Sequence, residues 1–224
     1  MATFRLNLAR IRGCPPPRKL AEAMDAFGLP EAEEFGVLNQ TATDQSALAT
    51  IIRRSQSAVQ RLDNRTREVT SVAVEKVTVY PFAVKPAGEL LEVYAGSAAA
   101  IEQVGAFLSS CLGLATVVET IELDVASALQ KLRKLSQHFV LRSARISEYA
   151  HNSYMSGPYA PKFLSGEHGM EFLSEYADFV AAAAVRFDGP GGRVSVTLTP
   201  KACFSFSCND DDQPAVQTIL RKLL

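Results

Sequence analysis

The sequence has no tryptophan and only three histidines among its 224 residues. His138, His151 and His168 are far apart and do not follow a metal-ligand spacing, and the four cysteines form no CxxC pair. The glycines of 189–192 lack the strand-to-helix context and the Lys-Ser/Thr of a phosphate-binding loop, so they predict a hairpin turn. We therefore predict no metal, no cofactor and no catalytic residue, and an enzyme is the least favoured function.

A charge imbalance is also missing, because 23 Lys and Arg residues face 24 Asp and Glu residues, a net charge of -1. This balance excludes a uniformly basic nucleic-acid coat. The longest apolar runs are shorter than the roughly 20 residues of a membrane span, and the first eight residues lack the continuous apolar region of a secretory signal. A cytoplasmic protein with reduced cysteines and no membrane partner is the expectation.

What the sequence does contain is enough apolar residues, 47%, for an ordinary globular core. Alternating apolar residues predict a strand over 3–12, and a proline and a glycine bound a helix over 17–28. The spacing of Leu48, Ile52, Val59 and Leu62 predicts a helix over 43–62.

The remainder of the chain predicts mostly strands and short helices. The β-branched stretch 67–95 favours two or three antiparallel strands. Asn209 to Asp212 are interpreted as a cap of the last helix in preference to a cation site. The other expected elements are helices over 97–113, 124–137, 170–179 and 212–224, and strands over 117–123, 180–187, 193–199 and 202–208.

Two stretches share one order of elements, three strands followed by a helix, over about 69–112 and about 180–224. This order predicts the α+β class, with antiparallel sheets that carry helices on one face and two strand-strand-strand-helix units. The expected domains are an N-terminal strand with helices over 1–66, a first sheet-helix unit over 67–137 and a second over 138–224.

Basic residues are segregated along the chain even though the net charge is close to zero. Only Asp63 is acidic between Arg53 and Arg67, and no residue is acidic between Lys131 and Arg145. Such clusters favour a local surface that holds phosphates, and the alternative is a solvated face with acidic partners from elsewhere in the fold. The predicted nucleic-acid-binding residues are Arg53, Arg54, Arg61, Arg65, Arg67, Lys131, Arg133, Lys134, Arg142 and Arg145.

The segment from His151 to Tyr159 is rich in turn-forming residues and tyrosines. His151, Tyr154 and Tyr159 are candidate contacts for a protein partner, because such side chains combine flat apolar area with hydrogen-bonding groups. The alternative interpretation is a packed connection in which the tyrosines cover a sheet edge.

The segment Glu89 to Val118 resembles the strand, Ala/Ser-rich turn, helix and strand of the recombination-associated RdgC family, and Phe204-Ser-Phe206 is loosely similar to that family's closing strands. That family binds duplex DNA without sequence preference as ring-shaped dimers. The resemblance implies a non-enzymatic, DNA-associated protein that forms an oligomer, and it carries over no individual site residue.

Together these patterns predict a protein that binds nucleic acid, most simply duplex DNA, through a local basic surface with little sequence preference. The alternative is an adaptor or subunit of a multiprotein complex, for example a defence-related one, that binds its partners through open sheet edges and the tyrosine-rich segment.

Overall fold

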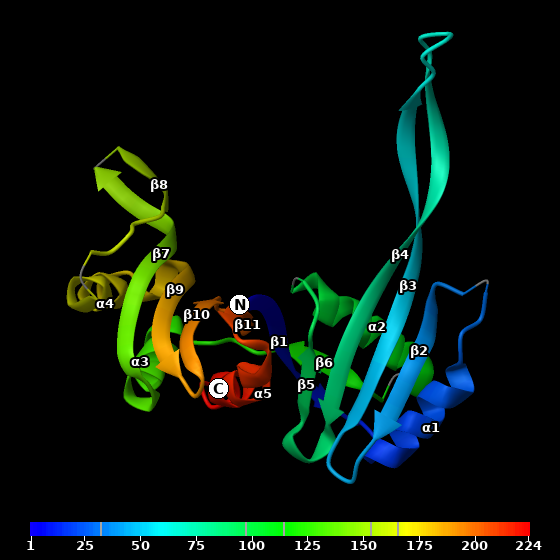
Figure 1. Cartoon of the computed structure of the whole chain (residues 1–224), viewed down its shortest axis with the longest axis horizontal. Coiled ribbons are helices and arrows are strands. Elements are labelled where there is room, and N and C mark those ends of the chain that lie inside the picture. The colour runs from blue at the N-terminus through cyan, green and yellow to red at the C-terminus, as the bar shows by residue number, and fades with distance from the viewer. Residues whose placement is uncertain (32, 97, 114, 153, 165) are drawn as a thin grey trace. The chain divides into compact units, whose positions relative to one another are not determined.

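The computed structural model describes residues 1–31, 33–96, 98–113, 115–152, 154–164 and 166–224. The chain forms two compact units: unit 1 contains residues 1–9, 96–98 and 119–224, and unit 2 contains residues 10–95 and 99–118. Figure 1 labels the helices and strands of both units and colours them by residue number. They do not coincide with the expected segments 1–66, 67–137 and 138–224, because the first strand, β1 (Ala2–Arg12), supplies residues to both units.

Unit 2 has one antiparallel meander in the order β2-β3-β4-β5, and Ile11 at the end of β1 donates its N–H to the carbonyl of Glu89. Two helices cover one face, where the ring of Phe107 contacts the rings of Phe27, Phe35 and Phe82. The elements are α1 (Pro17–Phe27), β2 (Phe35–Ala42), β3 (Ala47–Leu62), β4 (Val69–Lys85), η1 (Pro86–Gly88), β5 (Leu90–Val93) and α2 (Ala99–Leu112).

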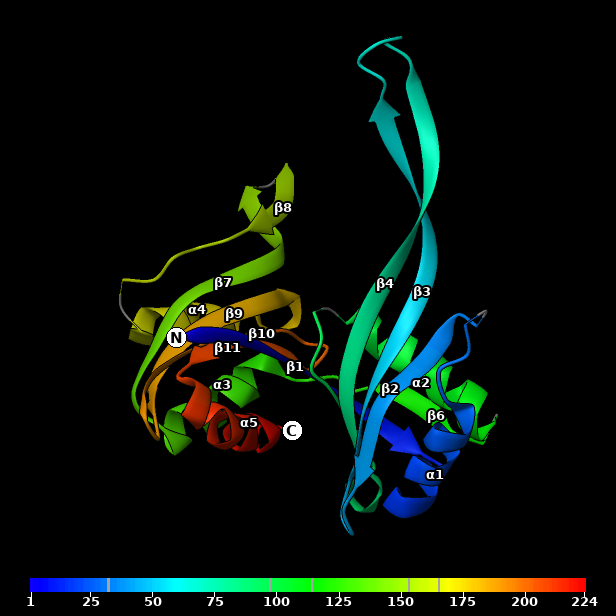
Figure 2. The same cartoon turned by 45° about the vertical axis from the view of Figure 1, so that its right-hand side comes forward.

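Unit 1 contains antiparallel strands in the order β1-β11-β10-β9-β7-β8. The short strand β6 (Val117–Thr120) pairs with β1 and has residues in both units. The helices α3 and α5 lie on one side of this sheet (Figure 2), and Leu129 and Leu132 of α3 and Val216 and Leu220 of α5 are buried. The remaining elements are α3 (Val125–Leu135), β7 (Gln137–Asn152), β8 (Met155–Tyr159), α4 (Gly166–Glu175), η2 (Ala177–Phe179), β9 (Val180–Gly189), β10 (Gly192–Leu198), β11 (Cys203–Cys208), η3 (Asp210–Asp212) and α5 (Gln213–Arg221).

The two units repeat one topology. Unit 2 runs α1-β2-β3-β4-β5-α2, and unit 1 runs α3-β7-β9-β10-β11-α5 with β8 and α4 inserted after its first strand. In both units part of β1 lies beside the last strand of the meander. The α+β class with antiparallel sheets is confirmed, and the repeat is longer than the three strands and one helix predicted from the sequence.

The expected helix over 43–62 is wrong, because all of β3 (Ala47–Leu62) lies within these residues. Ala47, Ala49 and Ile51 are buried in strict alternation, and every residue from Ala47 to Leu62 has a partner on β4. The stretch 67–95 contains one long strand and one short strand, which agrees with two antiparallel strands. The late hairpin of β9 and β10 is confirmed.

The prediction that a side chain from Asn209 to Asp212 caps the last helix is wrong, although these residues do precede that helix. These residues lead through η3 into α5, but no side chain of the described residues caps that helix. The amide of Asn209 instead donates to the Gly191 carbonyl at 3.3 Å and to Asp212 Oδ2 at 3.2 Å. None of the described helices is long and apolar enough to cross a membrane.

Candidate nucleic-acid interface

The β3–β4 ribbon extends beyond the other strands of unit 2. The pairing of β2 with β3 ends at Arg53, and the pairing of β5 with β4 ends at Phe82. Beyond these residues β3 and β4 pair only with each other, down to the pair of Leu62 and Val69 (Figure 1). We call residues 54–80 the ribbon, since this segment is a two-stranded structure with exposed faces.

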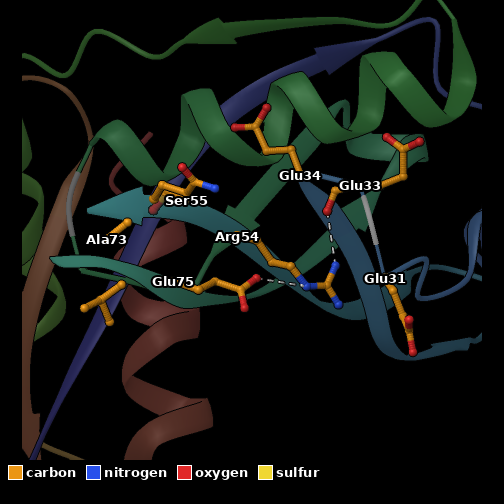
Figure 3. A pocket seen from close by; sticks show the side chains of 9 residues that line it. Glu31, Glu33, Glu34, Arg54, Ser55, Ala73 and Glu75 are labelled. Atoms are coloured by element: carbon orange, nitrogen blue, oxygen red, sulfur yellow. Dashed lines mark hydrogen bonds and ion pairs between the residues drawn. The ribbon is translucent and has the colours of Figure 1, made fainter. Parts of the chain in front are cut away.

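Acidic residues hold the two arginines at the base of the ribbon. Arg53 Nε lies 2.5 Å from a carboxylate oxygen of Glu34. Arg54 donates to the carbonyls of Pro30 and Glu33 at 2.8 and 3.1 Å. Its Nε lies 3.6 Å from Glu75 Oε1, and Figure 3 shows the contacts of Arg54 with Glu33 and Glu75. Because Arg53 and Arg54 lie on a strand and have acidic neighbours, they do not form the predicted helical stripe with Arg61.

The basic residues at the tip of the ribbon are in a different environment. Arg61 is exposed near the end of β3, and Arg65 and Arg67 are exposed in the turn. The carboxylate of Asp63 accepts the N–H groups of Arg65 and Thr66 at 2.7 and 3.3 Å, so it stabilises the turn. Within the described part of the chain, no carboxylate forms an ion pair with these three guanidinium groups.

A second basic surface lies on the sheet of unit 1, on the face opposite α3 and α5. We call it the open face. Alternation along the strands places Arg5, Arg145, Arg186 and Arg193 there, because their neighbours Leu6, Ala144, Val185 and Val194 are buried in the core. The register across the sheet shows which residues share this face. Arg5 on β1 pairs with Ser205 on β11, Ser205 pairs with Thr197 on β10, and Thr197 pairs with Ala184 on β9.

Arg142 joins this surface in a cavity of about 380 Å³ that is lined by His138, Val140, Arg142, Arg186, Asp188 and Arg193. Asp188 is the one carboxylate of this lining, and its Oδ2 lies 4.0 Å from His138 Nε2. The cavity therefore has three guanidinium groups and a single acid. Arg5, Arg186 and Arg193 are absent from the sequence-based prediction, although their alternation with buried apolar residues is visible in the sequence.

The basic residues predicted to form one cluster between Lys131 and Arg145 lie on different surfaces of unit 1. Lys131 Nζ donates to the carbonyls of Leu223 and Leu224 at 3.1 and 3.2 Å, so it binds the end of the α5 segment. Arg133 and Lys134 line a depression between α3 and α4 with Glu171. Only Arg142 and Arg145 of that cluster therefore belong to the open face.

The candidate partner-binding residues also separate. The side chain of His151 lies outside the described residues. Tyr154 is 93% exposed, whereas the ring of Tyr159 packs 4.6 Å from that of Tyr149. Tyr149 in turn lies 5.1 Å from Tyr176, so Tyr159 belongs to an aromatic cluster that joins β7, β8 and α4. Tyr159 is therefore part of a packed connection, whereas contact of the exposed Tyr154 with a protein partner stays a prediction.

The remaining side chains of the described residues with reactive chemistry are the possible metal ligands and the cysteines. No three His, Cys, Asp or Glu residues there are grouped so that they could hold a metal ion. Burial raises the pKa of the Cys14 thiol to about 11, and it also raises the pKa values of Cys111, Cys203 and Cys208. Each of these thiols is therefore a weak nucleophile at neutral pH.

The fold and its surfaces define the class of the protein: an α+β chain of two topologically repeated units with exposed arginines. No family model matches it. No curated protein matches it either.

Proposed function

We propose that this protein binds nucleic acid with little sequence preference, through contacts between the open face of unit 1 and phosphate groups. The observation that carries the proposal is the convergence of Arg5, Arg142, Arg145, Arg186 and Arg193, from four strands, on one sheet face, where Arg5 also donates to the Gly96 carbonyl at 2.6 Å. Guanidinium groups bind phosphate oxygens through paired N–H donors, which makes arginine well suited to this contact.

The spacing of the arginines supports an extended polyanion over a small anion. Neighbouring strands lie about 4.8 Å apart, so Arg186 on β9 and Arg5 on β1 are separated by roughly 14 Å across three strand intervals. The floor between them consists of small side chains, among them Ser195, Thr197 and Ser205. Hydroxyl groups can donate to phosphate and sugar oxygens without reading the bases, which is consistent with binding that ignores sequence.

The test is the salt dependence of binding to a fluorescent 20-base-pair DNA duplex. Five phosphate contacts predict that log K falls with log salt with a slope of about -4.5. The variant Arg142→Ala/Arg186→Ala/Arg193→Ala is expected to reduce this slope by about 2.7, because each lost contact removes about 0.9.

The matched control is Arg18→Ala/Lys19→Ala/Lys222→Ala, which removes the same charge from α1 and the end of α5. It is expected to bind with nearly the original slope. Binding that does not depend on salt, or an equal loss in both triple variants, would overturn the open face as the phosphate-binding surface.

A protein partner is the second candidate function, and exposed side chains at β8 favour it. Tyr154 and the neighbouring Met155 are 93% and 59% exposed, and exposed tyrosine and methionine are typical of interface anchors. A stable protein that co-purifies with the intact chain but not with Tyr154→Ala/Met155→Ser, in the absence of nucleic acid, would support this function.

A further inference from the structure

We infer that the β3–β4 ribbon inserts into the major groove of duplex DNA, and that it gives the protein a preference for a DNA duplex over both single strands and RNA duplexes. This inference rests on the proposed function and names the form of nucleic acid that is bound. It concerns residues 54–80 of unit 2, which are distinct from the open face of unit 1.

The dimensions of the ribbon fit this groove. The major groove of B-form DNA is about 12 Å wide and admits a two-stranded β-ribbon, whose strands lie about 4.8 Å apart. The outer half of the ribbon is slim, since it pairs Ser57 with Val74, Ala58 with Ala73 and Val59 with Val72. The major groove of an RNA duplex is too narrow for side chains to reach the bases.

The charges of the ribbon favour a polyanion at its tip. The strand segments Ser57–Leu62 and Val69–Val74 contain no acidic residue, and Arg61, Arg65 and Arg67 surround the turn. Of the two carboxylates there, Asp63 accepts the turn N–H groups, and Glu68 is the one that remains. Glu75 lies further toward the base, where Arg54 approaches it.

The uncharged side chains suit the interior of a groove. Val59 and Val72 are directly opposite each other, with Val74 on the same face, and they are 50%, 45% and 45% exposed. Aliphatic side chains can contact thymine methyl groups. Gln60 and Ser71 are opposite each other on the other face, where they can bond to base edges or phosphates. An isolated two-stranded ribbon is marginally stable in water, so a binding partner would stabilise it.

The main experiment compares the intact chain with a shortened variant in which residues 56–75 are replaced by Asn-Gly, a two-residue turn that joins the opposite residues Ser55 and Lys76. Binding is measured to one sequence as a DNA duplex, an RNA duplex and a single strand. The intact chain is expected to bind the DNA duplex about tenfold more tightly than the other two, and shortening is expected to remove that preference.

A second measurement is made first on the intact chain. Guanine N7 lies in the major groove, so the intact chain is expected to protect it from methylation by dimethyl sulfate. The variant Arg61→Ala/Arg65→Ala/Arg67→Ala retains the ribbon and should weaken DNA-duplex binding while the protection persists at saturation.

The outcomes separate the two proposals. If the shortened variant binds all three nucleic acids and retains the DNA-duplex preference, or if N7 stays reactive in the complex, the groove inference is overturned while the proposed function stands. If the intact chain binds no nucleic acid, both are overturned. A protein that co-purifies with the intact chain but not with the shortened variant, and excludes DNA from it, would also overturn the groove inference.

Discussion

Lys85 Nζ lies 2.5 Å from Oε1 of Glu92, a side chain with no exposed surface. The Tyr94 hydroxyl donates to the other carboxylate oxygen at 2.7 Å, and 34% of the Lys85 side chain remains exposed. The pair connects the adjacent strands β4 and β5 in unit 2. If the pair is broken, water can therefore hydrate the partly exposed Lys85 ammonium group but not the buried Glu92 carboxylate.

We predict that Lys85→Met destabilises the protein by about 3 kcal/mol, because it removes the cation from a buried carboxylate. Glu92→Gln should cost less, since the partly exposed ammonium group can be hydrated. The double change Lys85→Met/Glu92→Met should recover part of the loss. Urea unfolding of the three variants measures these differences, and a smaller loss for Lys85→Met than for Glu92→Gln would contradict the prediction.

Gly13 is predicted to be intolerant of any side chain. Its φ is +68°, and a Cβ would lie 2.1 Å from the carbonyl oxygen of Ala115. Gly13→Ala should therefore cost about 3 kcal/mol or more, from left-handed strain together with the backbone displacement.

The matched control is Gly113→Ala, since Gly113 also has a positive φ of +84° but has no atom within 4 Å of a Cβ. This variant should lose only about 1 kcal/mol, the cost of the left-handed conformation. Thermal unfolding compares the two, and equal losses would show that the contact with Ala115 is unimportant.

Asp124 is predicted to make the stability of α3 depend on pH. Its carboxylate accepts the hydroxyl of Ser127 at 2.6 Å and the N–H of Ser127 at 3.2 Å, and these bonds lower its pKa from the usual 3.8. A lowered pKa in the folded state stabilises the protein above the ordinary pKa, and this contribution is lost as the pH falls through the folded-state value.

At neutral pH, Asp124→Ala should therefore lose about 1 kcal/mol of stability, and the difference from the original chain should shrink in acid. Asp124→Asn retains a cap without a titrating group, so it should show no such convergence. Denaturant unfolding at a series of pH values is the measurement, and a constant difference for Asp124→Ala would refute the titrating cap.

The sequence predicts most elements of this fold because their burial patterns are regular. The hairpin of β9 and β10 has polar residues alternating with Val185, Phe187, Val194 and Val196, and the structure buries those four. The helix α2 also follows its apolar stripe. Local periodicity is sufficient where one face of an element meets a core.

The ribbon shows where periodicity fails. Its outer residues are exposed on both faces, so Val59 and Leu62 do not mark a buried side, and their helical spacing from Leu48 and Ile52 is coincidental. Better signals were the β-branched pair Ile51-Ile52 and the turn at Asp63-Asn64 between two runs of matching length. The open face was missed in part because its arginines come from three distant segments, β1, β7 and the hairpin of β9 and β10.

The division of β1 between the two units has a consequence for the order in which the chain folds. The hydroxyls of Thr3 and Ser207 are hydrogen-bonded although 204 residues separate them. At 5 to 20 residues per second, a ribosome needs roughly 10 to 40 s to supply β11 after β1 has been made. During that interval unit 2 can be completed, whereas the apolar residues Leu6 and Leu8 lack their final partners. Unit 1 is therefore completed later than unit 2. The interval before β11 is synthesised is the stage at which chaperones would be needed.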